Sequence, residues 1–170
     1  MRDEAIFLNG VWENVLQDIL KLQKYLPEHI MYLQPYSSDR IVHLAEDPPS
    51  ADDPVRLLMS ITNDLPHVRY MCEIVGWNDK RALSGEKLRW LNRVIYSFQW
   101  TESGVFMTTD SGSECRNLLY VRRMIQLATP FSVGELVKTT DDIPMATTRA
   151  SVGGWTYVKN PNDTWLAGYL

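Results

Sequence analysis

The chemistry that this sequence offers most clearly is aromatic stacking. Its tryptophans lie at or near the ends of predicted helices and strands: Trp12, Trp77, Trp90, Trp100 and Trp155. Element ends on one side of a small sheet converge, so these rings could form a cage. Such a cage can hold a flipped or methylated base by stacking while it excludes water. Core packing is the alternative for Trp12 and Trp90, and both roles suit Trp77 and Trp155, which each follow a glycine.

Local groups of cations could contact phosphates. One group is formed by Lys80, Arg81, Arg89 and Arg93, and a second by Arg116, Arg122, Arg123 and Arg149. Phosphate contacts need only such local groups and would make binding salt-dependent. Solubilising charge explains the same residues equally well. The predicted phosphate-binding set is Lys80, Arg81, Arg122, Arg123 and Arg149.

Catalytic and metal-binding patterns are absent from the sequence. The histidines His29, His43 and His67 do not form HExxH or any Cys/His metal spacing. Cys72 fits a buried, inert thiol, and Cys115 has no candidate base beside it. No glycine-rich phosphate loop is present. We therefore expect no catalytic residue, no metal site and no cofactor, and a protein that is not an enzyme by itself.

Length and composition fit a single globular domain. The chain has 170 residues, 45% hydrophobic and 22% charged. The net charge of −4 argues against a protein coated in nucleic-acid-binding charge, although a local basic patch remains compatible. No apolar run is long enough to span a bilayer, and two cysteines cannot build a disulfide framework. We expect a cytoplasmic protein with reduced thiols.

The chain pattern predicts helices that flank short strands. A first strand covers residues 4–11, broken by Asn9-Gly10, and apolar spacings of three and four then predict a helix that Pro27 stops. Residues 56–77 read as a hairpin whose turn contains Asn63 to Pro66. A second helix follows the N-cap Ser84 as far as Phe98.

A further strand is predicted over 118–127, which Arg122 and Arg123 interrupt or end. A short helix over 133–137 and a strand over 155–158 follow. Residues 45–54 and 78–83 are predicted loops. The order predicts an α+β fold with a curved sheet or small β-barrel flanked by helices.

This order resembles the EVE-type domains of the PUA superfamily, to which the YTH domains that read methylated adenine are related. The resemblance rests on IFLNGVWENVL (6–16), RLLMSIT (56–62), RYMCEIVGW (69–77), YVRRMIQL (120–127) and FSVGELV (131–137). It covers most of the chain and implies one domain over 1–165, with 166–170 starting a linker or next element. An acidic overall charge and a long second helix depart from a minimal EVE domain.

The resemblance implies a pocket for a modified base. Asn9, Trp12, Ser60 and Trp77 match the pocket positions, with Trp100 or Trp155 as a further wall. The expected function is to read a modified base in DNA, or in RNA, as the specificity module of a restriction or antiviral defence protein with an effector domain beyond Leu170. The alternative is a protein-interaction domain, or one that senses a small nucleotide-like ligand.

Overall fold

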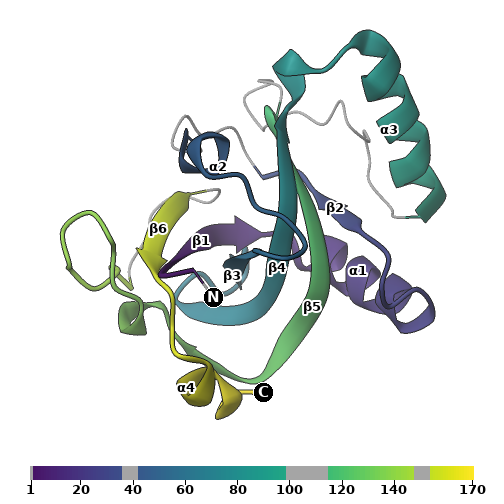
Figure 1. Cartoon of the computed structure of the whole chain (residues 1–170). Coiled ribbons are helices and arrows are strands. Elements are labelled where there is room, and N and C mark those ends of the chain that lie inside the picture. Colours follow the sequence, from purple (N-terminus) through teal and green to yellow (C-terminus); the bar gives the residue numbers. More distant parts are fainter. Residues whose placement is uncertain (1, 36–41, 99–114, 148–153) are drawn as a thin grey trace.

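A bent sheet of six strands forms the centre of the computed structural model, which describes residues 2–35, 42–98, 115–147 and 154–170 (Figure 1). The strands are β1 (Glu4–Val11), β2 (Met31–Leu33), β3 (Val55–Ile61), β4 (His67–Asp79), β5 (Asn117–Ser132) and β6 (Trp155–Lys159). The helices are α1 (Glu13–Tyr25), α2 (Val42–Glu46), α3 (Gly85–Phe98) and α4 (Asp163–Ala167), with short 3-10 turns η2 (Lys80–Ala82) and η4 (Val133–Glu135). The mixed content agrees with the α+β prediction.

The strand order is β2-β5-β4-β3-β1-β6. β1 runs parallel to β3 and antiparallel to β6, and the remaining pairs are antiparallel. Beyond β5, an isolated bridge joins Lys138 to Val158, and the Lys159 amide donates to the Val137 carbonyl at 2.8 Å. The chain that continues from β5 therefore covers the outer edge of β6.

Both faces of β1 are buried, because successive side chains of a strand point to opposite faces. Ile6 and Leu8 enter a first hydrophobic cluster, which α1 covers with Leu16 and Ile19. Ala5 and Phe7 enter a second cluster. The near-continuous apolar sequence of this strand follows from that two-sided burial.

The second cluster holds the C-terminal part of the chain. Leu166 of α4 is buried in it, and the ring of Tyr169 lies 5.0 Å from that of Phe131. Residues 166–170, where the sequence predicts the start of a linker or next element, include the end of α4.

The predicted hairpin and the predicted helices after Trp12 and Ser84 are confirmed. β3 and β4 pair from Val55 opposite Ile74 to Met59 opposite Tyr70. At the start of α3 the Ser84 hydroxyl accepts a hydrogen bond from the Lys87 amide at 3.1 Å, as expected of an N-cap.

Two boundaries were predicted wrongly. β4 continues through Asp79 into η2 where the sequence predicts a loop, because Asp79 caps that turn by accepting from the Arg81 amide. β5 runs on to Ser132 instead of ending at residue 127; of the two alternatives for its arginines, the interruption is observed, because Arg123 takes a positive φ of 53° where the register with β4 shifts. Residues 99–114, which include Trp100, lie outside the described residues.

Arg56 ties β3 to the C-terminal segment. Its Nη1 donates to Asn160 Oδ1 at 2.6 Å and to the Pro161 carbonyl at 2.8 Å, and its Nη2 pairs with Asp163. Arg56→Met is expected to lower the free energy of unfolding by about 1.5 to 3 kcal/mol, because these charge-assisted bonds hold α4 in place. Urea unfolding measures the loss. Lys21→Met, on the exposed side of α1, is the control and is expected to stay within about 0.5 kcal/mol of the parent; equal losses in both variants would contradict the role given to Arg56.

Candidate functional site

The C-terminal end of β1 carries an irregularity that places buried polar groups within the sheet. Between the pairs Leu8–Met59 and Val11–Ile61, β1 advances three residues while β3 advances two. Gly10 absorbs the extra residue with a φ of 76°, which glycine adopts without the steric cost of a side chain. The Gly10 amide consequently reaches the Ser60 hydroxyl, at 3.0 Å, instead of a backbone carbonyl.

Asn9 and Ser60 are fully buried at this irregularity, each with 0% exposure. The Ser60 hydroxyl accepts from Gly10 and donates to Asn9 Oδ1 at 3.0 Å. The backbone N–H of Asn9 donates to the Gly154 carbonyl at 2.8 Å. The structure therefore brings these two predicted residues together, as partners of each other.

Trp12 stands at the same end of β1. It occupies the N-cap position of α1 and is 54% exposed. The preceding Val11 carbonyl accepts from the Thr62 amide at 3.1 Å, so the β3–β4 turn lies beside it. On its other side, Glu13 accepts from the Tyr70 hydroxyl at 2.8 Å. Trp12 is therefore an exposed ring on a firmly bonded backbone.

The start of β4, just after this turn, adds His67 and Arg69, which the sequence analysis did not propose for the site. Asp64 binds His67 Nδ1 at 2.7 Å and Arg69 Nε at 2.5 Å. Burial acts to raise the pKa of the Asp64 carboxyl, but the bonds to His67 and Arg69 outweigh it and the pKa is lowered. An acid followed by a histidine and an arginine three and five residues later was the available signal. Both side chains are partly exposed, His67 by 48% and Arg69 by 37%.

Trp155 reaches the same end of β1 through its backbone, because it pairs with Leu8. Its ring is 3% exposed and packs in the first cluster with Met59. Ser60 points to the opposite face of β3 from Met59. The sheet thus separates the Trp155 ring from the Ser60 hydroxyl.

Trp77 does not join these residues. It lies near the far end of β4, beyond the last pair with β3, where its Nε1 donates to Asn117 Oδ1 at 3.0 Å. The ring is partly buried against the first cluster. Trp100 falls outside the described residues.

The predicted phosphate-binding cations are engaged within the protein. Lys80 is 2% exposed and donates to Gln34 Oε1 at 3.0 Å. Arg81 pairs with Asp79, while Arg122 and Arg123 share Glu73. Arg149 falls outside the described residues.

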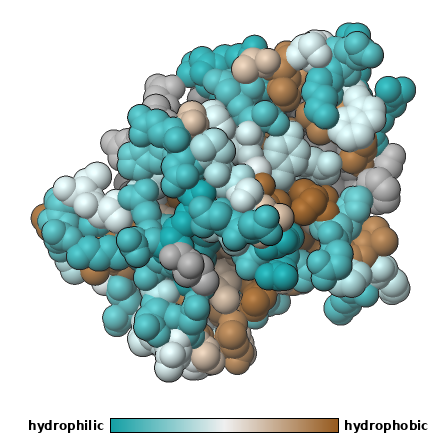
Figure 2. Space-filling model, viewed as in Figure 1, coloured by the Kyte–Doolittle hydropathy of each residue, from teal (hydrophilic) through white to brown (hydrophobic). Residues whose placement is uncertain are grey.

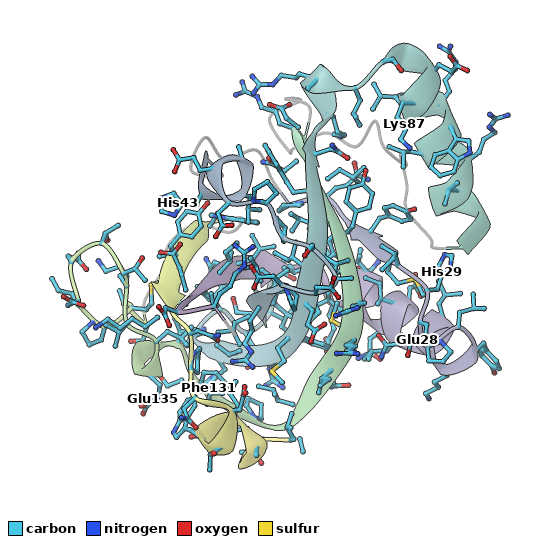
Figure 3. The ribbon with its side chains drawn as sticks, viewed as in Figure 1. Glu28, His29, His43, Lys87, Phe131 and Glu135 are labelled. Carbon is cyan, nitrogen blue, oxygen red and sulfur yellow. The ribbon has the colours of Figure 1, made fainter. Side chains whose placement is uncertain are left out.

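Exposed cations gather instead on α3, around a tryptophan. Trp90 is 46% exposed, and Lys87 Nζ lies 4.3 Å from its ring centroid. Arg89 and Arg93 are exposed on the same helix. Figure 3 shows Lys87 on α3, beside the stick-drawn ring, and far from His43 of α2.

A cavity of about 410 Å³ lies between α2 and the N-terminal half of β1. Its wall includes Glu4, which binds His43 Nδ1 at 3.0 Å and the Thr139 hydroxyl at 2.8 Å. The His43 and Tyr157 rings stack with centroids 4.0 Å apart. Burial raises the pKa of the Tyr157 hydroxyl. The wall also contains Asp3, Glu46 and Asp47 beside one cation, Arg2, which pairs with Asp47 at 2.9 Å, so its net character is acidic and does not favour phosphates.

The described part of the chain contains no cluster of three or more His, Cys, Asp or Glu side chains that could hold a metal ion. The same residues include no helix long and apolar enough to cross a membrane. Cys72 is buried as predicted, and burial raises the pKa of its thiol. No protein-family model, curated protein or solved structure matches the chain.

Proposed function

We propose that this chain is a nucleic-acid-binding module with a PUA/EVE-like fold, which reads a modified base in DNA and serves as the specificity domain of a larger defence protein. The site is the C-terminal end of β1. The observation that carries the proposal is the half-exposed Trp12 ring, held at the N-cap of α1 beside the irregularity formed by Asn9, Gly10 and Ser60.

The surroundings of Trp12 support a role in stacking. A tryptophan ring that presents a face to solvent can stack a flipped base, and an added methyl group increases the apolar area in that contact. His67 and Arg69 lie at the start of β4, just after the turn that bonds to the Val11 carbonyl, and the Arg69 guanidinium could meet the backbone of a flipped nucleotide. The buried Asn9–Ser60 pair fixes the backbone from which Trp12 projects.

Trp12→Ala is expected to abolish the preference for a modified duplex over a plain one, with at least roughly a fivefold loss of affinity for the modified duplex. This magnitude corresponds to the stacking of one base on an aromatic ring. Fluorescence anisotropy with matched duplexes that carry 5-methylcytosine, N6-methyladenine or no modification measures both affinities.

Tyr25→Ala is the matched control, because Tyr25 is an exposed aromatic residue at the opposite end of α1. It is expected to keep the preference. Equal binding of modified and plain duplexes by the parent protein would refute the proposal, as would an unchanged preference in Trp12→Ala.

The second candidate, a domain that senses a small ligand, is favoured by the cavity beside His43 and Tyr157. Its volume is within the range of small-molecule sites. The acidic wall suits a cationic ligand. A thermal shift with small amines, together with no binding to oligonucleotides, would support this candidate over the first.

A further inference from the structure

The helix α3 concentrates positive charge in an acidic protein. Three of its four charged residues are Lys87, Arg89 and Arg93, and the fourth is Glu86, so the helix carries a net charge of +2. The complete chain carries −4, which leaves −6 for the remainder. An anionic partner is therefore attracted to α3 and repelled by most of the other surface.

The helical spacing places these cations around one aromatic ring. Lys87 and Arg93 lie three residues before and after Trp90, and Arg89 lies four residues before Arg93. Residues three and four apart are neighbours on a helix surface. The four side chains of Lys87, Arg89, Trp90 and Arg93, which we call the α3 surface, thus occupy one side of the helix, within an arc of roughly 160°.

The other side of α3 already has its partner within the fold. Leu91 is buried with Leu118 in a third hydrophobic cluster, and Leu88 packs against it. This leaves Trp90 as the large apolar group among exposed charges on the described part of the helix. Such a surface offers too little apolar area to insert into a bilayer, but an aromatic ring flanked by cations suits the bases and phosphates of a nucleic acid.

Its position separates the α3 surface from the proposed base site. Trp12 lies near Tyr70, because Glu13 binds the Tyr70 hydroxyl, whereas α3 follows the far end of β4. Asp79 lies nine residues beyond Tyr70, which corresponds to at most about 30 Å along a strand. In Figure 1 α3 projects at the upper right, and Figure 2 shows hydrophilic residues, in teal, over much of that region.

We infer that the α3 surface is a second nucleic-acid contact, which binds the phosphate backbone of the duplex that flanks the base that is read. The inference rests on the proposed function and extends it from a single base to the flanking duplex. The contact adds affinity without sequence or modification preference, since phosphates carry neither.

The test compares Arg89→Gln/Arg93→Gln with the parent protein, on plain and modified duplexes. The double variant is expected to bind both about tenfold more weakly, and the slope of log K against log salt is expected to become shallower by about 1.8, as for two lost phosphate contacts. Glu86→Gln is the matched control on the same helix, because it removes the negative charge there and is expected to strengthen binding. Thermal unfolding checks that these exposed substitutions leave the fold intact.

Duplex length separates the α3 contact from the base site. On a duplex of about 30 base pairs with a central modified base the double variant is expected to show its full loss, and on one of about 8 base pairs a smaller loss, because the short duplex extends only about four base pairs on either side of the modified base. An unchanged affinity and salt slope on the long duplex would overturn the inference while the modification preference of the parent protein survives. If the parent protein binds modified and plain duplexes equally while the double variant still loses affinity and salt slope, the base site is refuted and the α3 contact stands. Binding to phosphatidylserine vesicles in place of duplexes, lost in the double variant, would overturn the nucleic-acid assignment.

Discussion

Tyr70→Ala is expected to lower the free energy of unfolding by about 3 to 5 kcal/mol, as for the truncation of a fully buried aromatic side chain. Tyr70 is 0% exposed and packs in the first cluster, opposite Met59 at the turn end of the β3–β4 pairing. Its hydroxyl donates to Glu13 at 2.8 Å and accepts from Gln17 at 2.6 Å. The substitution therefore leaves a cavity in the core and also releases the first turn of α1 from the sheet. Urea unfolding followed by circular dichroism measures the loss.

Tyr70→Phe separates the two contributions, because it keeps the ring and removes the hydroxyl. We expect a loss of only about 0.5 to 1.5 kcal/mol at neutral pH. Burial and, after it, the bond to Glu13 raise the pKa of Tyr70 from 10.0 to about 12. The folded state thus holds this proton more tightly than the unfolded chain, so its contribution is complete below pH 10 and is lost as the pH rises through 12.

The stability of the parent protein should consequently fall between pH 10 and pH 12 more steeply than that of Tyr70→Phe. Burial also raises the pKa of Tyr120 to about 12. The Tyr70→Phe variant is therefore expected to keep part of this loss of stability. Identical pH profiles for the parent and Tyr70→Phe, or a small effect of Tyr70→Ala, would contradict the buried position of this side chain.

Much of the fold could be predicted because local patterns and tertiary packing agree. The apolar spacing of α1 matches the side that packs on the core, where Ile19 is buried and Val15 and Leu22 are partly buried. The Asn9-Gly10 break was predicted from its residue types and is the β1 irregularity of the structure. The extension of β5 from residue 127 to Ser132 could not be predicted in this way. It depends on pairing with β4, which is distant in the sequence, through pairs such as Phe131 with Val68.

The candidate site was predicted less well, because residue type does not determine position in a sheet. Asn9 and Ser60 meet, since they lie on neighbouring strands at the same level, and Trp12 follows directly. Trp77 was grouped with them by its place after a strand, but β4 is long enough to carry it to the other end of the sheet. Residue type also failed to predict which cations are available to a phosphate. Lys80 was predicted to bind one, but it is buried and donates to Gln34.

Ser60→Ala is expected to destabilise the protein by about 2 to 4 kcal/mol, although it removes a single oxygen atom. The Ser60 hydroxyl serves two buried groups at once, the Gly10 amide and Asn9 Oδ1. Without it both lose a partner at a site with no exposure to water, and each buried unsatisfied group costs about 1 to 3 kcal/mol. Ser132→Ala is the matched control, because its hydroxyl accepts only from the Gly134 amide at a partly exposed turn, where about 1 kcal/mol is expected.

A double-mutant cycle with Asn9→Ala tests whether the two buried residues act as a unit. Each single variant leaves the other residue without its partner, whereas the double variant removes both groups together. The two losses should therefore add to more than the loss in the double variant, with an interaction energy of about 0.5 to 3 kcal/mol. Additive losses would show that Asn9 and Ser60 do not depend on each other. That result would also contradict the proposal that the Asn9–Ser60 pair holds rigid the backbone from which Trp12 meets a base.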